Sequence, residues 1–424
     1  MPAIRYALIL ALVPLILTGP PVMAQISGGG VDVPAGGKAE PTIAINSRDP
    51  NNLAVASNDG GQSLRVSTDG GATFSAATFP FVPGYTTVGD PSIAFDSQGR
   101  LFWTHLAVRR RFPERDNADV FISQVDPATG AILAGYPVNV SAGAGLAARD
   151  GHYNHKEWIA VDRFEGSPFQ DRIYVVWTDE LTRGGIPDDG AVVTAFSSDQ
   201  GITWSAGLTL FTSLEGFPFT HNAVAANGDV YVAYNDRPLD TIGESGQVMV
   251  HRSTDGGVSY PQKSMAYAPG AADVTLNFQT ESRLLYKSVS IMGGSSQPWV
   301  LPDPMNTNNV YVVSSDDPTN VDHGAGFDDM AVFIARSLNR GLSWSSPAQI
   351  DSGPGVSHQL MPTAAIDHLT GCIAVTWYDS RAELTNEDGN FLLDMVLASS
   401  GDGGLTFGPG GLDGQHGHRS GNSV

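Results

Sequence analysis

The sequence predicts an all-β protein, a six-bladed β-propeller of four-stranded antiparallel blades. Two repeated patterns and the composition predict it. An eight-residue turn motif occurs in five copies, and a β-rich strand occurs in six. The 424 residues include 49 glycines and 27 prolines, which favour strands and turns over helices. Repetition at this spacing is typical of propellers, in which ring closure protects blade edges that would otherwise invite aggregation.

The turn motif reads Ser-x-Asp-x-Gly-x-Thr-aromatic. The Asp is expected to accept hydrogen bonds from turn amides, and the Gly to adopt positive φ where the chain reverses. The aromatic residue is expected to begin the next strand and to bury a large apolar face. None of these roles needs a substrate, so the motif predicts structure rather than catalysis. The copies are 67–74, 197–204, 253–260, 337–344 and 400–407, with a degenerate one at 123–130.

The second pattern is a β-rich strand that ends in Asp in five of its six copies. A short apolar strand precedes each copy, so each unit is expected to run strand, turn, strand, loop, strand, Asp-type turn, strand. The copies are 53–59, 101–107, 173–179, 230–236, 310–316 and 373–379. The expected blades are 41–80, 90–143, 157–213, 219–267, 296–350 and 360–410, with 268–295 as an insertion.

The N-terminal 24 residues are expected to form a secretory signal peptide. Arg5 precedes an apolar run from Ala7 to Leu17, and Val22-Met23-Ala24 supplies a small-residue cleavage pattern. The run is too short to span a bilayer, which takes about 20 residues. We therefore expect a secreted protein, extracellular or periplasmic, with no membrane span. Its propeller would cover 25–410, and 411–424 would be a disordered tail.

The formal net charge is −21. Such acidity argues against nucleic acid and against an anionic membrane surface as partners, because both would repel the chain. Solubility is the simplest interpretation of the charge.

Binding residues are expected on the loops that follow the second strand of each unit, opposite the Asp-type turns, because loops on a rigid scaffold carry most sites. The Asp residues at this place either cap turns or include an acid, a base or a metal ligand. Arg237 and Arg381 follow two of them and either hold an anionic ligand or pair with these carboxylates. The Asp residues are Asp59, Asp179, Asp236, Asp316 and Asp379.

The connection from Arg149 to Trp158 is rich in groups that move protons or bind metals. Within it, Glu157 is expected near the mouth of the central channel, where the innermost strand starts. His155 lies beside it, and His221 stands in a similar position before the fourth blade. These side chains either converge on one site or are separate polar residues.

Two loops, 314–329 and 386–390, are rich in carboxylate and amide oxygens. Such oxygens suit Ca²⁺, although neither loop has the spacing of an EF-hand. Apart from this calcium hypothesis, we expect neither a metal nor a cofactor.

The five turn motifs resemble the Asp boxes, or BNR repeats, of the sialidase superfamily, and the resemblance covers nearly all of the mature chain. It implies a sialidase-like six-bladed propeller. It also implies a secreted glycoside hydrolase that acts on an extracellular glycan or cell-surface glycoconjugate, with exo-α-sialidase as one form. Family sialidases place three Arg on the substrate carboxylate and use a Tyr nucleophile paired with Glu, plus an Asp acid/base. Asp59 lies where that Asp is expected.

The chain departs from the family at two places. The Phe/Tyr-Arg-Ile-Pro motif of the first inner strand is absent, because residues 37–43 contain no Arg. Residues 357–362, before the sixth blade, contain no Tyr to act as nucleophile.

Two functions therefore stay open. In the first, the protein is a glycoside hydrolase with three catalytic candidates, Asp59, Glu157 and Asp236. Its substrate-binding candidates would be Arg237, Arg381, His155, His221, Asp179 and Asp379. In the second, the protein is a non-catalytic propeller that binds a glycan or a protein.

Overall fold

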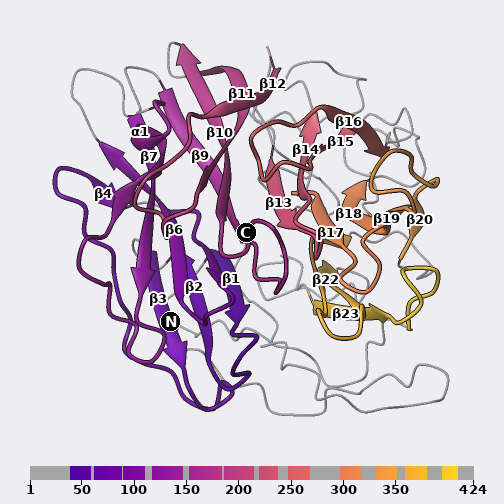
Figure 1. Cartoon of the computed structure of the whole chain (residues 1–424), viewed down its shortest axis with the longest axis horizontal. Helices are drawn as coiled ribbons and strands as arrows, with labels where there is room; N and C mark the ends of the chain where they lie inside the picture. Colours follow the sequence, from indigo (N-terminus) through magenta and orange to yellow (C-terminus); the bar gives the residue numbers. More distant parts are fainter. Residues whose placement is uncertain are drawn as a thin grey trace, which may run out of the picture. The chain divides into compact units, whose positions relative to one another are not determined.

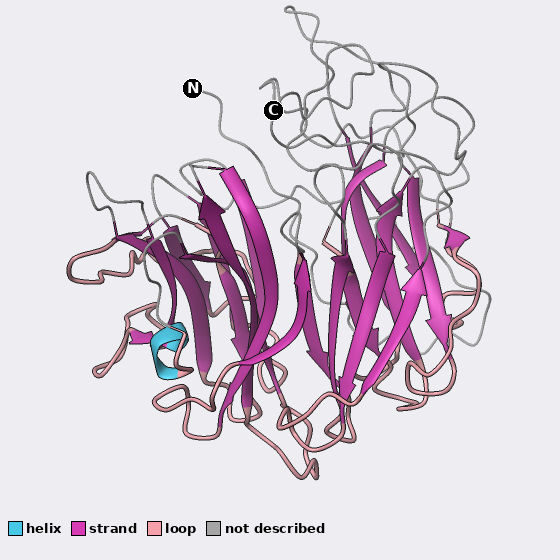
Figure 2. Ribbon diagram, turned by 90° about the horizontal axis from the view of Figure 1, so that it is seen from above, coloured by secondary structure: helices cyan, strands magenta, loops and turns pink. Residues whose placement is uncertain are grey.

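The computed structural model shows an all-β protein, as the composition predicts (Figures 1 and 2). The one helix within the described chain is α1 (Val140–Gly143), of four residues. Among the described residues no helix is long and apolar enough to cross a membrane. The structure describes 39–58, 62–87, 89–109, 117–146, 152–183, 186–213, 219–236, 247–267, 297–316, 331–350, 359–379 and 394–408.

Among these residues, hydrogen bonding gives five sheets. The first contains β1 (Ala39–Ile45), β2 (Leu53–Asn58) and β3 (Gln62–Ser67). The second contains β4 (Thr86–Thr87), β5 (Ser92–Phe95), β6 (Leu101–Arg109), β7 (Asn117–Val125), β8 (Val138–Asn139), β9 (His152–Val161), β10 (Ile173–Arg183), β11 (Ile186–Ser197) and β12 (Leu208–Ser213).

The remaining sheets follow in chain order. The third contains β13 (Thr220–Val224), β14 (Val230–Asp236), β15 (Gln247–Ser253) and β16 (Gln262–Tyr267). The fourth contains β17 (Trp299–Pro302), β18 (Val310–Asp316), β19 (Ala331–Ser337) and β20 (Ala348–Gln349). The fifth contains β21 (Gln359–Ile366), β22 (Ile373–Asp379) and β23 (Asp394–Ser400).

The strand order of the repeating unit is confirmed, apart from three differences. The fifth sheet has three strands among the described residues, where four were expected. The second sheet combines two expected blades, because Ala118 of β7 and Tyr153 of β9 pair in parallel. In the first unit, the described fourth strand is reduced to an isolated bridge between Leu64 and Thr78. Closure into a ring and the count of six blades stay predictions.

Two compact units divide the chain. Unit 1 comprises the described residues of Gly30–Val232 and Arg252–Pro261, and unit 2 those of Ala233–His251 and Gln262–Val424. In unit 1, Trp103 packs with residues of β2 and β3, and Trp177 packs with residues of β6 and β7. In unit 2, Trp377 and Tyr311 share one core cluster. Each large buried side chain contributes about 1.5–3 kcal/mol of burial free energy, which fixes the strands within each unit.

The turn motif forms a closed hydrogen-bond network. In the first copy, Asp69 Oδ1 accepts from Ser67 Oγ and from Thr73 N, both at 2.8 Å. Asp69 Oδ2 accepts from Thr73 Oγ1 at 2.6 Å, and Gly71 has φ 88°. The hydrogen bonds of the Thr73 hydroxyl and amide lower the pKa of Asp69 to about 2. Equivalent networks surround Asp199, Asp255, Asn339 and Asp402.

The aromatic residue of the motif does not begin the next strand, and that expectation is wrong. Phe74, Trp204 and Trp344 all precede it in irregular chain. They nevertheless bury part of their rings: Phe74 packs against Leu53 and Val55, and Trp204 against the core cluster around Trp177. The aromatic ring therefore anchors the turn to the core before the chain becomes extended again.

A one-residue bulge interrupts the first strand of several units at an equivalent place. In β1, the bulge residue Glu40 has φ 52°, and the pairing shifts between Ala39 and Thr42. In β9, Lys156 has φ 55°, and two residues oppose Trp177 alone. In β21, Met361 has φ 50° at the corresponding shift. A bulge bends the strand and re-aims the side chains that it carries.

The segment before β5 has the same form. Asp90 has φ 57°. The bond from Leu106 N to Gly89 O and the pairing of Ser92 with Thr104 leave one extra residue on this side. Three charged residues of unit 1, Glu40, Asp90 and Lys156, thus share one unusual backbone position.

A charge cluster as the candidate functional site

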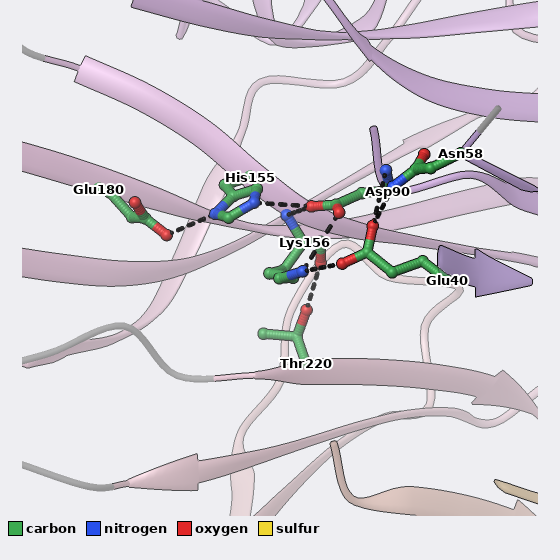
Figure 3. Close-up of polar contacts among 7 residues, drawn as sticks. All are labelled: Glu40, Asn58, Asp90, His155, Lys156, Glu180 and Thr220. Carbon is green, nitrogen blue, oxygen red and sulfur yellow. Dashed lines mark hydrogen bonds and ion pairs between the residues drawn. The ribbon is translucent and has the colours of Figure 1, made fainter. Parts of the chain in front are cut away.

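Five charged side chains of unit 1 meet at these bulges (Figure 3). We call them the charge cluster: Glu40 on β1, Asp90 before β5, His155 and Lys156 on β9, and Glu180 on β10.

The charge cluster lies at the strand ends opposite the Asp-type turns. In the β9–β12 part of the second sheet, Ser197, which begins the turn motif, pairs with Ile173. His155 instead pairs with Thr178, towards the other end of β10. Within this part of the sheet, the turn motif and the charge cluster therefore lie towards opposite strand ends.

His155 is held between two carboxylates. Its Nε2 lies 2.8 Å from Asp90 Oδ2, and its Nδ1 lies 2.8 Å from Glu180 Oε1. Burial opposes the charged imidazolium, but the charges of Asp90 and Glu180 outweigh it and raise the pKa of His155 to about 10. At neutral pH both ring nitrogens therefore donate, and His155 is a fixed cation.

Asp90 accepts three hydrogen bonds from residues of β9. Besides His155, the backbone N of Lys156 lies 3.1 Å from its Oδ2, and Lys156 Nζ lies 3.2 Å from its Oδ1. Burial disfavours the carboxylate, yet the neighbouring charges of His155 and Lys156 hold the pKa of Asp90 well below its usual value. Asp90 is thus a buried carboxylate that stays ionised.

Glu40 is the most exposed acid of the charge cluster, with 41% of its side chain accessible. Its Oε1 accepts from Lys156 Nζ at 2.8 Å, and its Oε2 accepts from the side-chain amide of Asn58. Burial, the charge of Asp90 and a carboxyl–carboxyl hydrogen bond with Asp90 raise the pKa of Glu40. The two neighbouring acids therefore have pKa values that shift in opposite directions.

Glu157 follows Lys156 and is only 2% exposed. Within the described chain, neither carboxyl oxygen has a hydrogen-bond partner beyond its own backbone N–H. Burial, followed by the charge of Asp90, raises the pKa of Glu157 well above its usual value. Burial therefore favours the uncharged form of Glu157.

This arrangement suits proton transfer better than metal binding. It combines an exposed acid of raised pKa, an ionised carboxylate and two cations that neutralise most of the negative charge. Within the described residues no group of three or more His, Cys, Asp or Glu side chains could hold a metal ion. The two oxygen-rich loops considered for Ca²⁺ lie largely outside the described residues.

Of the residues expected from sequence, His155 joins the charge cluster and Glu157 lies beside it. Asp179 pairs instead with His152, whose Nδ1 lies 2.9 Å from Asp179 Oδ1. His221 is buried against Trp158, with ring centroids 5.2 Å apart, and burial lowers its pKa to about 3.

The other candidates lie elsewhere. Asp379 in unit 2 is buried and accepts from Trp377 Nε1 at 3.0 Å, as an Asp that fixes a strand end would. Asp236 ends β14, but its side chain is outside the described residues. Asp59, Arg237 and Arg381 lie outside the described residues altogether.

Sequence reasoning missed four residues of the charge cluster as candidates: Glu40, Asp90, Lys156 and Glu180. A signal for two of them was present, because Glu40-Pro41 and Asp90-Pro91 are acidic residues that directly precede a strand-initiating Pro. Lys156 stands beside Glu157 in the connection that was considered. Nothing in the sequence singles out Glu180.

No protein-family profile and no curated protein matches the chain. Among solved structures, it is similar to a protein of unknown function from Dyadobacter fermentans. The identity is 13% over 85% of this chain and 93% of that one, with a TM-score of 0.48. An ulvan lyase of polysaccharide lyase family 25 gives 12% identity over 88% and 84% of the two chains, with a TM-score of 0.48.

The chain is also similar to the Hadza microbial sialidase Hz136. The identity is 12% over 82% of this chain and 65% of that one, with a TM-score of 0.44. All three TM-scores lie below 0.5, so the charge cluster is interpreted from its own geometry.

Proposed function

We propose that the chain is a glycan-active enzyme of the glycoside hydrolase class, with its acid–base chemistry in the charge cluster. One observation carries the proposal: Glu40 and Asp90 are adjacent carboxyl groups whose pKa values shift in opposite directions. Such a pair supplies a proton donor and an ionised carboxylate, the two kinds of group that acid–base catalysis uses. The resemblance of the turn motifs to Asp boxes supports the same class.

Glu40 is the proton donor in this mechanism, because its side chain is accessible and its pKa is raised. Its proton passes to the leaving oxygen as the glycosidic C–O bond breaks, and the attacking water returns a proton to Glu40. Asp90 stays ionised and stabilises the positive charge that develops on the sugar ring. His155 and Lys156 fix the position of Asp90 through the contacts described.

A panel of fluorogenic glycosides tests this proposal. Glu40→Gln keeps the size of the side chain but removes the transferable proton, so we expect activity on the best substrate to fall about 10²–10⁴-fold. Asp90→Asn should lower it as well. The matched control is Glu165→Gln, which removes a surface charge from the exposed turn after β9.

The control should retain full activity. If folded wild-type protein turns over no member of the panel, or if Glu40→Gln is as active as wild type, the hydrolase proposal fails. Circular dichroism of each variant separates loss of chemistry from loss of fold.

Exo-α-sialidase activity is the finer form of the proposal, and the Asp-box resemblance alone supports it. In that form Asp59 is the acid, Arg237 and Arg381 hold the carboxylate of the sugar, and Asp236 completes the site. A sialoside in the panel distinguishes this form: its turnover, and loss of turnover in Asp59→Asn, would favour it over hydrolysis of another glycan.

Non-catalytic glycan or protein binding is the alternative. It is favoured by the internal pairing of the charge cluster, since Asp90 already accepts three hydrogen bonds from residues of β9. Glycan-array binding that persists in Glu40→Gln and Asp59→Asn, with no turnover by wild type, would support this function.

A further inference from the structure

Glu157 occupies a position that the repeats define independently. In each repeat, the residue directly after the first strand donates its N–H to a carbonyl across the following turn. This common bond gives a reference point from which equivalent positions in the six first strands can be counted. The six bonds are Asn46 to Asn52, Asp96 to Arg100, Asp162 to Arg172, Ala225 to Asp229, Asp303 to Asn309 and Asp367 to Cys372. Five residues before each donor stand Pro41, Pro91, Glu157, Thr220, Pro298 and Pro362.

Proline fills four of these six positions, so the fold needs neither a backbone N–H nor a polar side chain there. Backbone conformation does not explain Glu157 either. Lys156, which precedes Glu157, has φ 55°, and Glu40, which precedes Pro41, has nearly the same φ of 52°, so the same backbone accepts a Pro. A carboxyl whose two oxygens lack partners is costly to bury, even uncharged. Folding therefore gives no reason for Glu157, and a role in the adjacent charge cluster does.

The charged groups that act on Glu157 come from two elements. Asp90 comes from the segment before β5, and His155 and Lys156 come from β9 itself. Two further carboxylates, Glu180 of β10 and Glu40 of β1, bind His155 and Lys156. The bulge opposes Trp177 of β10, and His221 of β13, which packs on Trp158, is uncharged because burial lowers its pKa to about 3.

We propose that Glu157 is a positioning residue: uncharged, it leaves His155 and Lys156 to Asp90, and once ionised it competes with Asp90 for both cations. The proton on Glu157 thus keeps the charge cluster in its described arrangement. Its consequence for catalysis rests on the proposed function, but the arrangement itself is a property of the folded chain.

The test follows the His155 ring by NMR in protein labelled at histidine, during a titration from neutral to alkaline pH. His155→Gln assigns the signal among the ten histidines of the chain. In wild type, ionisation of Glu157 should shift the His155 ring signals before the imidazolium titrates, and this step should be absent in Glu157→Gln, which is permanently uncharged. Because a neighbouring carboxylate stabilises an imidazolium, the His155 midpoint should also lie lower in Glu157→Gln than in wild type. Glu157→Pro, which copies the other repeats, should behave in the same way, and Glu165→Gln should match wild type.

Equal midpoints in wild type and Glu157→Gln would overturn the proposal. So would loss of the imidazolium signal at neutral pH in folded Glu157→Gln, because the cluster would then need a bond from the carboxyl. Should Glu157→Pro not fold, Glu157→Gln decides alone.

The activity assay adds a separate reading. If the panel finds a substrate, the alkaline midpoint of the kcat/KM profile should fall in Glu157→Gln by the shift seen for His155. If the panel finds none, the hydrolase proposal fails while the NMR titration still decides the role of Glu157.

Discussion

At the residue scale, the charge cluster combines rare backbone conformations with ionised side chains. Glu40, Asp90 and Lys156 have φ values between 52° and 57°, a region that costs residues with a Cβ about 1–2 kcal/mol each. All three are bound to one another by ion pairs or hydrogen bonds. The left-handed backbone is what directs these side chains from three different strand segments to one point, so the conformational strain is part of how the site is built.

Stability should depend on pH through Glu157. Its pKa is raised in the folded chain above the usual value of 4.5, so between these two values the folded state holds a proton that the unfolded state releases. The stabilising contribution is therefore complete below pH 4.5 and is lost as pH rises through the folded-state pKa. Glu157→Gln has no such proton to lose.

The difference in melting temperature, Glu157→Gln minus wild type, should therefore grow as pH rises above about 5. Thermal unfolding monitored by circular dichroism across a pH series measures it. A difference that stays constant with pH would show that Glu157 has an ordinary pKa in the folded chain.

At the scale of elements, the turn motifs allow a comparison of Asp with Asn at the same position of the turn. In the second copy, Asp199 accepts from Ser197 Oγ, Thr203 N and Thr203 Oγ1 at 2.6–2.9 Å. In the fourth copy, Asn339 forms the corresponding contacts, with its Nδ2 donating to Ser343 Oγ at 2.8 Å. An amide therefore satisfies the turn nearly as well as a carboxylate does.

Asp199→Ala should lower the melting temperature clearly, because a hydrogen bond of this kind contributes about 1 kcal/mol and several are lost together. Asp199→Asn should lower it much less, as the natural copy at Asn339 indicates. Differential scanning calorimetry of both variants measures this. Equal losses would mean that the negative charge, and not the bonding pattern, stabilises the turn.

The sequence predicts the second strands well because each is a continuous apolar run with a clear end: β14 runs from Val230 to Asp236 and β22 from Ile373 to Asp379, as expected. It predicts the first strands less well. β9 begins at His152 rather than near Trp158. Its first residues are polar and pair with the end of β10, so no apolar pattern in the sequence indicates that they form a strand.

The candidate site was predictable only in part, for the same reason. His155 and Glu157 were found because proton-transfer groups are dense around them. Glu40 and Asp90 were missed because each precedes a Pro and so falls outside the expected strand. The bulges bring Glu40 and Asp90 to Lys156, from which they are 116 and 66 residues away in the sequence, and a local pattern does not encode such contacts.

At the scale of the whole molecule, export stays a prediction of the first 24 residues. Expressed with these residues in a secreting host, the protein should appear outside the cytoplasm and begin at Gln25, because the small residues before it suit signal peptidase. N-terminal sequencing of the exported protein measures this. Retention of the full chain in the cytoplasm would contradict the prediction.

The repeated bulge also offers a second position at which the side chains of the charge cluster could be introduced. Met361-Pro362 has the same register shift as Lys156-Glu157 and nearly the same φ, 50° against 55°. Both pairs face a buried tryptophan, Trp377 or Trp177. Replacing Met361 with Lys and Pro362 with Glu, with an acidic acceptor beside them, would use a backbone that already has the required bulge and φ. A designer could thus add a second ionic centre by exchanging side chains alone.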